Sequence, residues 1–217
     1  MAAAKKPYRN YFLGDACLCW SLGNTIGRLT SLQVLFVYRR LKADKELSGL
    51  GVRDLVPSYT ALAVHADTLS DWQEVRRVVD RCFDSLPVAE TELLERTGRH
   101  ILPVSYRGED LPRVAKLHGL TVEEVIGRHT AVEYMVAMIG FRPHFPYLLG
   151  LDQSLVTPRL GTPRLKVPAG AVAIGGEQTG VYPEESPGGW NILGMTDPEL
   201  LKPINPGDTI VFQRIPS

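Results

Sequence analysis

Apolar and polar positions form clear patterns through the first half of the chain. Residues 11–22 alternate as a β-strand does, and leucines and valines at helical spacing follow from Arg28 to Leu41. Glycines and a proline bound two further strands, which we expect at 52–56 and 58–65. Valines at helical spacing predict a second helix over 71–86, with N-cap residues directly before it. This order of strands and helices predicts a small α+β sandwich.

The second half begins with helical patterns and continues as short apolar runs. The spacing predicts a helix over 110–118 that Gly119 ends, and then a second helix over 122–130. Thr121 and Glu124 form a capping-box pattern at the start of that second helix. Strands are expected at residues 101–106, 134–139, 172–174, 190–194 and 209–212. Many short strands separated by glycine and proline are typical of a closed or nearly closed barrel.

A polar connector at residues 87–100 separates these two halves, and Leu93 and Leu94 are the residues that could anchor it. We therefore expect an α+β protein with two domains, at residues 1–98 and 99–217. A chain of 217 residues is long enough to bury a sizeable core in this arrangement.

Composition and charge argue against several classes of protein. Lysine plus arginine equals aspartate plus glutamate at 24 each, whereas a general nucleic-acid or membrane-surface binder needs a basic excess. The start of the chain lacks the apolar core of a signal peptide, and no apolar run approaches membrane-spanning length. The three cysteines have no paired spacing, and we expect Cys17 and Cys19 to be buried free thiols. A reducing cytoplasm fits these features.

Four segments rich in proline, glycine, arginine and aromatic residues follow one another between His129 and Trp190. They cover residues 140–148, 157–170, 175–183 and 185–190. Such sequences favour turns and short strands over helices and long strands. Binding residues commonly lie on loops that a rigid scaffold positions. The sequence therefore locates a site more clearly than it identifies a ligand.

Arg159 and Arg164 are candidate anion-binding residues within the second of these segments. Each follows a proline, which fixes φ and biases the preceding threonine to an extended conformation. Two guanidinium groups on a stiff backbone would suit a carboxylate or phosphate, which arginine binds with two hydrogen bonds. The alternative is that both arginines pair with nearby acids and hold the loop in place.

Gln178 and Trp190 are further candidates, each with a structural alternative. Gln178 stands among glycines and could orient an amide or carboxylate, although this segment resembles a phosphate-binding loop only loosely. Gly188 and Gly189 would let the backbone approach closely and place the indole of Trp190 in a pocket wall. A packed core tryptophan is the competing interpretation.

His129 is the remaining candidate for acid–base chemistry. It would form an i,i+4 pair with Glu133 if the helix extended that far, but one histidine and one acid do not make a metal site. A hydrogen-bonded structural histidine is the alternative. The sequence contains no complete catalytic motif of a known kind, and we assign no metal ligands.

The ordered motifs of the chain resemble those of the carboxyltransferase subdomain C/D family. They read YRGEDL, GLTVEEVIGRH, EYMVAMIGFRPHFPYL, TPRLGTPRLKVPAGAVAIGGEQTGVYP, SPGGW and PGDTIVF. The resemblance covers nearly the whole chain and is strongest from Tyr106 to Phe212. The family includes the B subunit of 5-oxoprolinase, a Kip-type inhibitor of a sporulation histidine kinase, and allophanate hydrolase subunit 1.

The resemblance implies a small α+β N-terminal domain and a cyclophilin-like β-barrel C-terminal domain. It implies membership of a complex that opens 5-oxo-L-proline to L-glutamate with ATP, whose site is shared with partner subunits. The implied partners are a carboxyltransferase subdomain A/B subunit and a LamB/YcsF-type subunit. Inhibition of a sensor histidine kinase and hydrolysis of allophanate are the alternative functions.

The resemblance also implies which residues line the pocket of the barrel. The implied catalytic residues are His129, Arg159 and Gln178. The implied substrate-binding residues are Phe141, Phe145, Tyr147, Arg164, Tyr182, Gly188, Gly189 and Trp190.

Two departures from the family pattern concern this pocket. His144 stands where the family usually has glycine, so the turn is expected to be rearranged or to admit a different ligand. A longer Gly-Pro-Asp-Leu run of the family is shortened here to residues 109–112.

Overall fold

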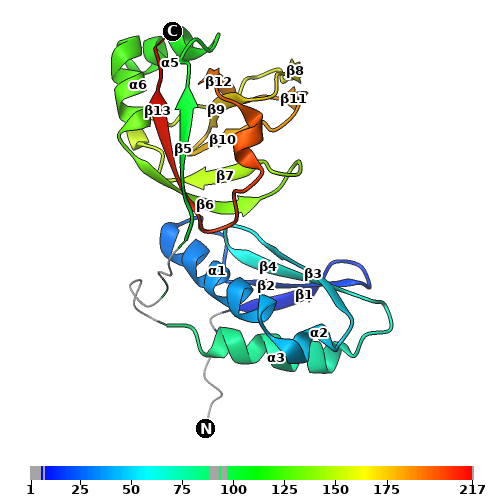
Figure 1. Cartoon of the computed structure of the whole chain (residues 1–217). Helices are drawn as coiled ribbons and strands as arrows, with labels where there is room; N and C mark the ends of the chain where they lie inside the picture. The colour runs from blue at the N-terminus through cyan, green and yellow to red at the C-terminus, as the bar shows by residue number, and fades with distance from the viewer. Residues whose placement is uncertain (1–5, 7, 88–92, 94–96, 217) are drawn as a thin grey trace. The chain divides into compact units, whose positions relative to one another are not determined.

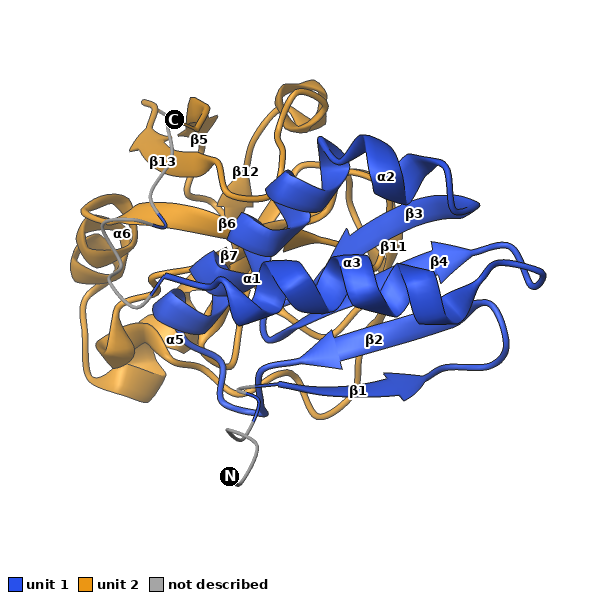
Figure 2. Ribbon diagram, turned by 90° about the horizontal axis from the view of Figure 1, so that it is seen from below, with its two compact units in different colours: residues 1–96 blue, residues 97–217 orange. Residues whose placement is uncertain are grey.

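The computed structural model describes residue 6, residues 8–87, residue 93 and residues 97–216 (Figure 1). The chain divides into two compact units, residues 1–96 and 97–217, which are coloured separately in Figure 2. Both units combine helices with strands, so the predicted α+β class is confirmed. Within the described residues, no helix has both the length and the apolar character that crossing a membrane requires.

The first unit is a four-stranded antiparallel sheet with helices on one face. Its strands lie in the order β1 (Arg9–Phe12), β2 (Cys17–Ser21), β4 (Ala61–Ala66) and β3 (Val52–Pro57). Two long helices lie across the sheet and a short one precedes β3 (Figure 2): α1 (Arg28–Lys42), α3 (Trp72–Asp84) and α2 (Lys45–Ser48). The order of elements follows the prediction except at two places: two strands, β1 and β2, stand where one was expected, and the short helix α2 was not predicted.

Alternate residues of β2 form the core of this unit against α3. Leu18 and Trp20 are fully buried, and the indole N–H of Trp20 donates to Asp80 of α3 at 2.7 Å. The Trp20 ring also stacks on Phe83 of the same helix, with centroids 6.5 Å apart. The buried indole thus has both apolar neighbours and a hydrogen-bond acceptor, which fixes α3 against the sheet.

The single strand predicted over residues 11–22 is wrong, because two antiparallel strands, β1 and β2, cover this region. Gly14 lies in the turn between them at φ +69°, and the N–H of Leu13 donates to the carbonyl of Cys17 at 2.8 Å. The alternation of apolar residues continues on both strands, so periodicity alone does not reveal the reversal. The adjacent glycine and aspartate, Gly14 and Asp15, are the local signal of the turn.

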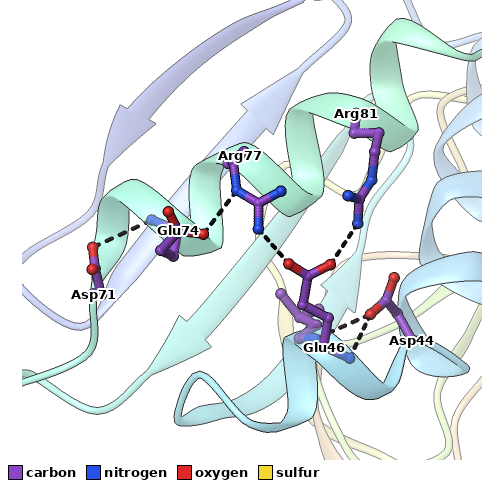
Figure 3. A network of polar contacts seen from close by, with 7 residues as sticks. Asp44, Glu46, Asp71, Glu74, Arg77 and Arg81 are labelled. Atoms are coloured by element: carbon purple, nitrogen blue, oxygen red, sulfur yellow. Dashed lines mark hydrogen bonds and ion pairs between the residues drawn. The ribbon is translucent and has the colours of Figure 1, made fainter.

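A surface network of charged residues joins α2 to α3 (Figure 3). Glu46 of α2 accepts hydrogen bonds from Arg77 and, at 2.8 Å, from Arg81, and these two arginines hold the pKa of its carboxyl below the usual range. Asp44 and Asp71 cap the two helices through backbone N–H groups. Exposed ion pairs stabilise a fold little, so this network orients the short helix more than it strengthens the unit.

The predicted polar connector lies mostly outside the described residues. Leu94 is among those left out, whereas Leu93 is described and is fully buried. The second unit begins at residue 97.

The second unit is a seven-stranded sheet that curls into a nearly closed barrel. Its strands lie in the order β12 (Asn191–Met195), β9 (Ala171–Gly175), β10 (Gln178–Val181), β7 (Pro146–Leu149), β6 (Glu133–Ile139), β13 (Thr209–Arg214) and β5 (Arg99–Val104). The two edges meet at Ser105 and Met195, whose backbone N–H groups each donate to the other's carbonyl at 2.9 Å. The barrel predicted from the short strands is therefore confirmed.

Shorter elements complete the second unit. Helices α5 (Leu111–His118) and α6 (Val122–Thr130) pack their apolar residues into the core of the barrel. Two strands form a separate pair, and two 3-10 helices lie in loops: β8 (Arg164–Val167), β11 (Ser186–Gly188), η1 (Gln153–Leu155) and η2 (Pro198–Leu201).

The ends of α5 and α6 follow from their sequences as predicted. Gly119 ends α5 in the left-handed conformation at φ +64°, which glycine adopts without strain. Thr121 accepts from the backbone of Glu124 at 3.2 Å, and the Glu124 carboxylate accepts from the backbone of Thr121 at 2.7 Å. The predicted capping box is confirmed.

Candidate ligand-binding site

The second unit carries a small cavity of about 110 Å³ that is walled mainly by aromatic rings. Its lining residues come from the loop between β6 and β7, from β7, from the segment between η1 and β8, and from β11 with its flanking loops: Phe141, Phe145, Tyr147, Arg159, Tyr182, Pro187, Gly188, Gly189 and Trp190. Eight of these nine residues are predicted catalytic or substrate-binding residues, and the ninth, Pro187, belongs to the same SPGGW motif. The structure thus gathers residues that lie up to 49 positions apart in the sequence (190 − 141).

Phe145 is the centre of the aromatic wall. It is 2% exposed and meets Tyr182 and Trp190 edge to face, with ring centroids 5.1 and 5.7 Å away. Tyr147 packs against it at 4.8 Å, and Phe141 meets it edge to face at 5.5 Å. Each such pair contributes about 0.5–1.5 kcal/mol beyond the area it buries, so the rings stabilise one another.

Glycines let these rings pack closely. A Cβ at Gly175 would lie 2.5 Å from Cδ1 of Trp190, and one at Gly188 would lie 2.3 Å from the hydroxyl of Tyr182. Neither distance can be tolerated, because the neighbours are rings held inside the cluster. Trp190 therefore satisfies both interpretations given above, since it is a packed core residue and a wall of the cavity.

The two tyrosines supply polar groups within this apolar wall. Burial raises the pKa of both Tyr147 and Tyr182, so both phenols keep their protons at neutral pH. Each hydroxyl is thus a hydrogen-bond donor as well as an acceptor at the cavity.

Arg159 is the cationic residue of the cavity. Its guanidinium carbon lies 5.8 Å from the centroid of the Trp190 ring, which is within the range of a cation–π contact. Among the residues that the structure describes, no carboxylate pairs with Arg159. Its hydrogen-bond donors are therefore available to an anion beside the aromatic wall.

Arg164, the second arginine of the repeated Thr-Pro-Arg motif, has a different environment. Its guanidinium binds Asp110 and Glu109, each at 2.8 Å, and donates to the carbonyl of Trp190 at 3.4 Å. Asp110 is buried and also accepts from the backbone N–H of Ile192 at 2.7 Å. Arg164 does not line the cavity; it ties β8 to the segment that carries Trp190.

His129 lies in the core of the barrel and not in the cavity. It is completely buried and stacks on Phe212 at 4.7 Å between centroids. Thr179 donates its hydroxyl to the carbonyl of Ala173, so it accepts from the Nε2–H of His129 at 3.0 Å, and Nδ1 accepts from Tyr106 at 2.7 Å. Burial lowers the pKa of His129 to about 3, which keeps the imidazole neutral.

The helix that precedes His129 does not extend to Glu133. Helix α6 ends at Thr130, and Glu133 is the first residue of β6, where it accepts a hydrogen bond from Arg99 at 2.9 Å. The i,i+4 pair considered from the sequence is therefore not formed. The neighbours of His129 across the core, Tyr106 and Thr179, were not identified from the sequence because they come from distant segments.

Gln178 begins β10 and is not among the residues that line the cavity. The glycine-rich segment around it is the hairpin between β9 and β10, in which Gln178 pairs with Gly175 and Gly176 adopts φ +63°. A phosphate-binding loop would lead into a helix, whereas this segment leads into a strand.

The loop between β6 and β7 holds two residues other than glycine in a left-handed backbone conformation that normally favours glycine. His144 has φ +66°, in the left-handed region, and Phe141 has φ +65°. These are the two described residues other than glycine with positive φ, and such a conformation costs roughly 1–2 kcal/mol. The turn was expected to be rearranged at His144 or to admit a different ligand, and the backbone of His144 has a conformation that suits glycine.

We expect His144→Gly to raise the free energy of unfolding by about 0.5–1 kcal/mol. Relief of the left-handed strain exceeds the extra backbone entropy that glycine gains in the unfolded chain. Urea unfolding of the two proteins measures the difference. His144→Ala is the control, because it removes the imidazole and keeps the strain; a gain of equal size in this variant would contradict the explanation.

The fold and the cavity define a two-unit α+β protein whose barrel carries an aromatic pocket with one arginine at its edge. Residues 8–209 match the family described as carboxyltransferase domain, subdomain C and D, and the chain belongs to that family. The resemblance seen in the sequence motifs is thus confirmed.

Curated relatives are similar over most of their length. The chain is 40% identical over 185 residues to the B subunit of 5-oxoprolinase from Haemophilus influenzae, covering 80% of this chain and 82% of that protein. It is 38% identical over 183 residues to the B subunit of 5-oxoprolinase from Bacillus subtilis, covering 76% of each.

Solved structures share the fold. The crystal structure of TTHA0988 superposes with a TM-score of 0.77 at 34% identity, covering 93% of this chain. The chain spans 40% of the length of that protein. The urea carboxylase of Kluyveromyces lactis superposes with a TM-score of 0.70 at 14% identity, covering 96% of this chain and 22% of that one, which shows a common fold.

Proposed function

We propose that this chain is a subunit of an ATP-dependent 5-oxoprolinase complex, which hydrolyses 5-oxo-L-proline to L-glutamate, and that the chain is inactive alone. Its similarity to the B subunits of two 5-oxoprolinases over at least three quarters of each chain supports this assignment. The structural observation that carries it is Arg159, a guanidinium with no carboxylate partner among the described residues, beside a small aromatic cavity.

In this proposal the cavity binds the substrate by its carboxylate and its ring. Arg159 holds the carboxylate with two parallel hydrogen bonds. The carbon atoms of the ring contact Phe145 and Trp190, and a phenol of Tyr147 or Tyr182 donates to the lactam oxygen. Because Phe145 and Trp190 are buried and fixed by packing, they hold the lactam in one orientation for the reaction.

The cavity is too small to hold ATP. A volume of about 110 Å³ is well below the roughly 300–1,000 Å³ of pockets that bury drug-sized ligands, and ATP is at least that large. We therefore assign the nucleotide to partner subunits. The partner subunits that we propose are a carboxyltransferase subdomain A/B subunit and a LamB/YcsF-type subunit. We propose that the complex acts in the cytoplasm.

His129 and Gln178 lie outside the cavity, and the proposal gives them no direct contact with substrate. His129 supports the wall from behind through Thr179, which is next to Gly180 on β10. A Cβ at Gly180 would lie 3.1 Å from both Phe145 and Trp190, so a shift of β10 would displace the wall.

A subunit-omission assay tests the proposal. We expect a mixture of this chain with the two partner subunits to form L-glutamate from 5-oxo-L-proline only when ATP is present, and omission of this chain to abolish the product. Activity that persists without this chain would refute the assignment. Allophanate as substrate, and a sensor histidine kinase assayed for loss of autophosphorylation, separate the two alternative functions.

A further inference from the structure

Phe141 combines a strained backbone with an exposed apolar side chain. Its φ of +65° lies in the left-handed region, which a bulky residue rarely occupies. Its ring is 57% exposed although it is one of the large aromatic residues of the chain. Glycine would fit the backbone without strain and would expose no apolar surface. Strain that persists in this way clusters at ligand-binding sites, so the residue points to a function.

The position of the ring indicates what that function is. Phe141 lines the cavity at its edge and meets Phe145 and Tyr182 edge to face, with centroids 5.5 and 6.4 Å away. The exposed part of the ring is therefore continuous with the aromatic wall. A ligand seated against Phe145 would cover part of the apolar surface that Phe141 now exposes.

Three backbone hydrogen bonds hold the strained turn. The N–H of Arg142 donates to Gly140 at 2.7 Å, that of Phe145 donates to Arg142 at 3.1 Å, and that of Gly140 donates to Phe145 at 3.2 Å. The guanidinium of Arg142 also reaches the carboxylate of Glu184 at 3.4 Å, which links the loop to the segment after Tyr182. The turn is thus fixed on both sides of Phe141.

We propose that Phe141 determines the specificity of the cavity by closing over the uncharged ring of a bound cyclic carboxylate while Arg159 holds its carboxylate. This inference rests on the proposed function. The reaction opens the lactam, so its product carries an ammonium group and a second carboxylate where the substrate had a neutral amide. An apolar ring at that position favours the cyclic substrate and disfavours the charged open-chain product, because burying an unpaired charge is costly. Phe141 therefore separates 5-oxo-L-proline from L-glutamate.

Paired substitutions of Phe141 test the ring and the strain separately. In the assembled complex, Phe141→Ala is expected to weaken binding of 5-oxo-L-proline about 10-fold and to leave that of L-glutamate within about 2-fold, as loss of one well-placed apolar contact predicts. Phe141→Gly is expected to have the same effect on binding. Its melting temperature should lie about 2 °C above that of Phe141→Ala, because glycine relieves the left-handed strain in a chain of this size.

His144→Gly is the matched control, since it relieves the same kind of strain three residues away on a side chain that does not line the cavity. It should raise the melting temperature and leave both affinities unchanged.

If the wild-type complex binds 5-oxo-L-proline and Phe141→Ala binds it equally well, the role of Phe141 is refuted and the proposed function stands. If the wild-type complex binds no 5-oxo-L-proline, both are refuted. Equal melting temperatures for the alanine and glycine variants of Phe141 would contradict the claim that the backbone is strained at this position.

Discussion

Acidification from about pH 6.5 to about pH 4.5 is expected to remove about 2 kcal/mol of unfolding free energy through His129 alone. Burial lowers the pKa of His129 to about 3 in the folded protein, whereas an unfolded chain titrates it near the ordinary value of about 6.5. Between these values the unfolded state binds a proton that the folded state does not, so stability falls as the pH falls. The contribution of His129 is complete above about pH 6.5, and its loss ends near pH 3.

Comparison with His129→Gln isolates this effect from the titration of carboxylates. The variant keeps a polar side chain but loses the titrating group, and it is less stable at neutral pH because Tyr106 and Thr179 lose their partner. Urea unfolding of both proteins across the range should give slopes of stability against pH that differ by about 1.4 kcal/mol per pH unit. Parallel slopes would show that His129 is protonated in the folded protein as readily as in the unfolded chain.

Arg159→Ala is expected to weaken binding of 5-oxo-L-proline by about 10- to 100-fold and to leave stability nearly unchanged. A charge-assisted hydrogen-bonded pair contributes about 1.5–3 kcal/mol, and each 1.4 kcal/mol is tenfold in affinity. The guanidinium pairs with no described carboxylate, so its removal breaks no ion pair of the fold. Isothermal titration of the assembled complex measures the affinity.

Arg164→Ala is the matched control, because Arg164 follows the same Thr-Pro pair as Arg159. This substitution should lower stability and leave binding of 5-oxo-L-proline nearly unchanged. Loss of the arginine leaves the buried carboxylate of Asp110 without a cation, which costs about 2 kcal/mol of stability since Asp110 keeps the N–H of Ile192. Equal effects of the two substitutions on binding would contradict the proposal that Arg159, and not Arg164, binds the substrate carboxylate. Unchanged affinity in Arg159→Ala would exclude it from the site.

Local features of the fold could be predicted from the sequence because their causes are local. The capping box of Thr121 and Glu124 and the helix end at Gly119 depend on residues within one or two turns of the chain. The four-residue strands β7, β8 and β10 lack such a signal, since their conformation is fixed by pairing with distant strands. The part of the chain that contains these three strands was predicted as turns and short strands, but which strands pair with one another is known only from the structure.

The members of the cavity could be predicted only in part for the same reason. Arg159 and Arg164 follow the same Thr-Pro pair in the sequence, and the residue that separates them in the structure is Asp110, 54 positions before Arg164. His129 likewise appears as a candidate acid or base until Thr179, 50 positions later, shows that its ring faces the core. Residue type indicates the available chemistry, but only the folded neighbours show whether a side chain already has a partner.

The pairing of β5 with β13 has a consequence for synthesis of the protein. The first strand of the barrel lies parallel to the last, and Arg99 is opposite Thr209, which is 110 positions later in the sequence. Such long-range pairing forms slowly because a large loop must close first. A ribosome must therefore release residues up to Arg214 before this sheet can be completed, and until then β5 lacks its partner strand.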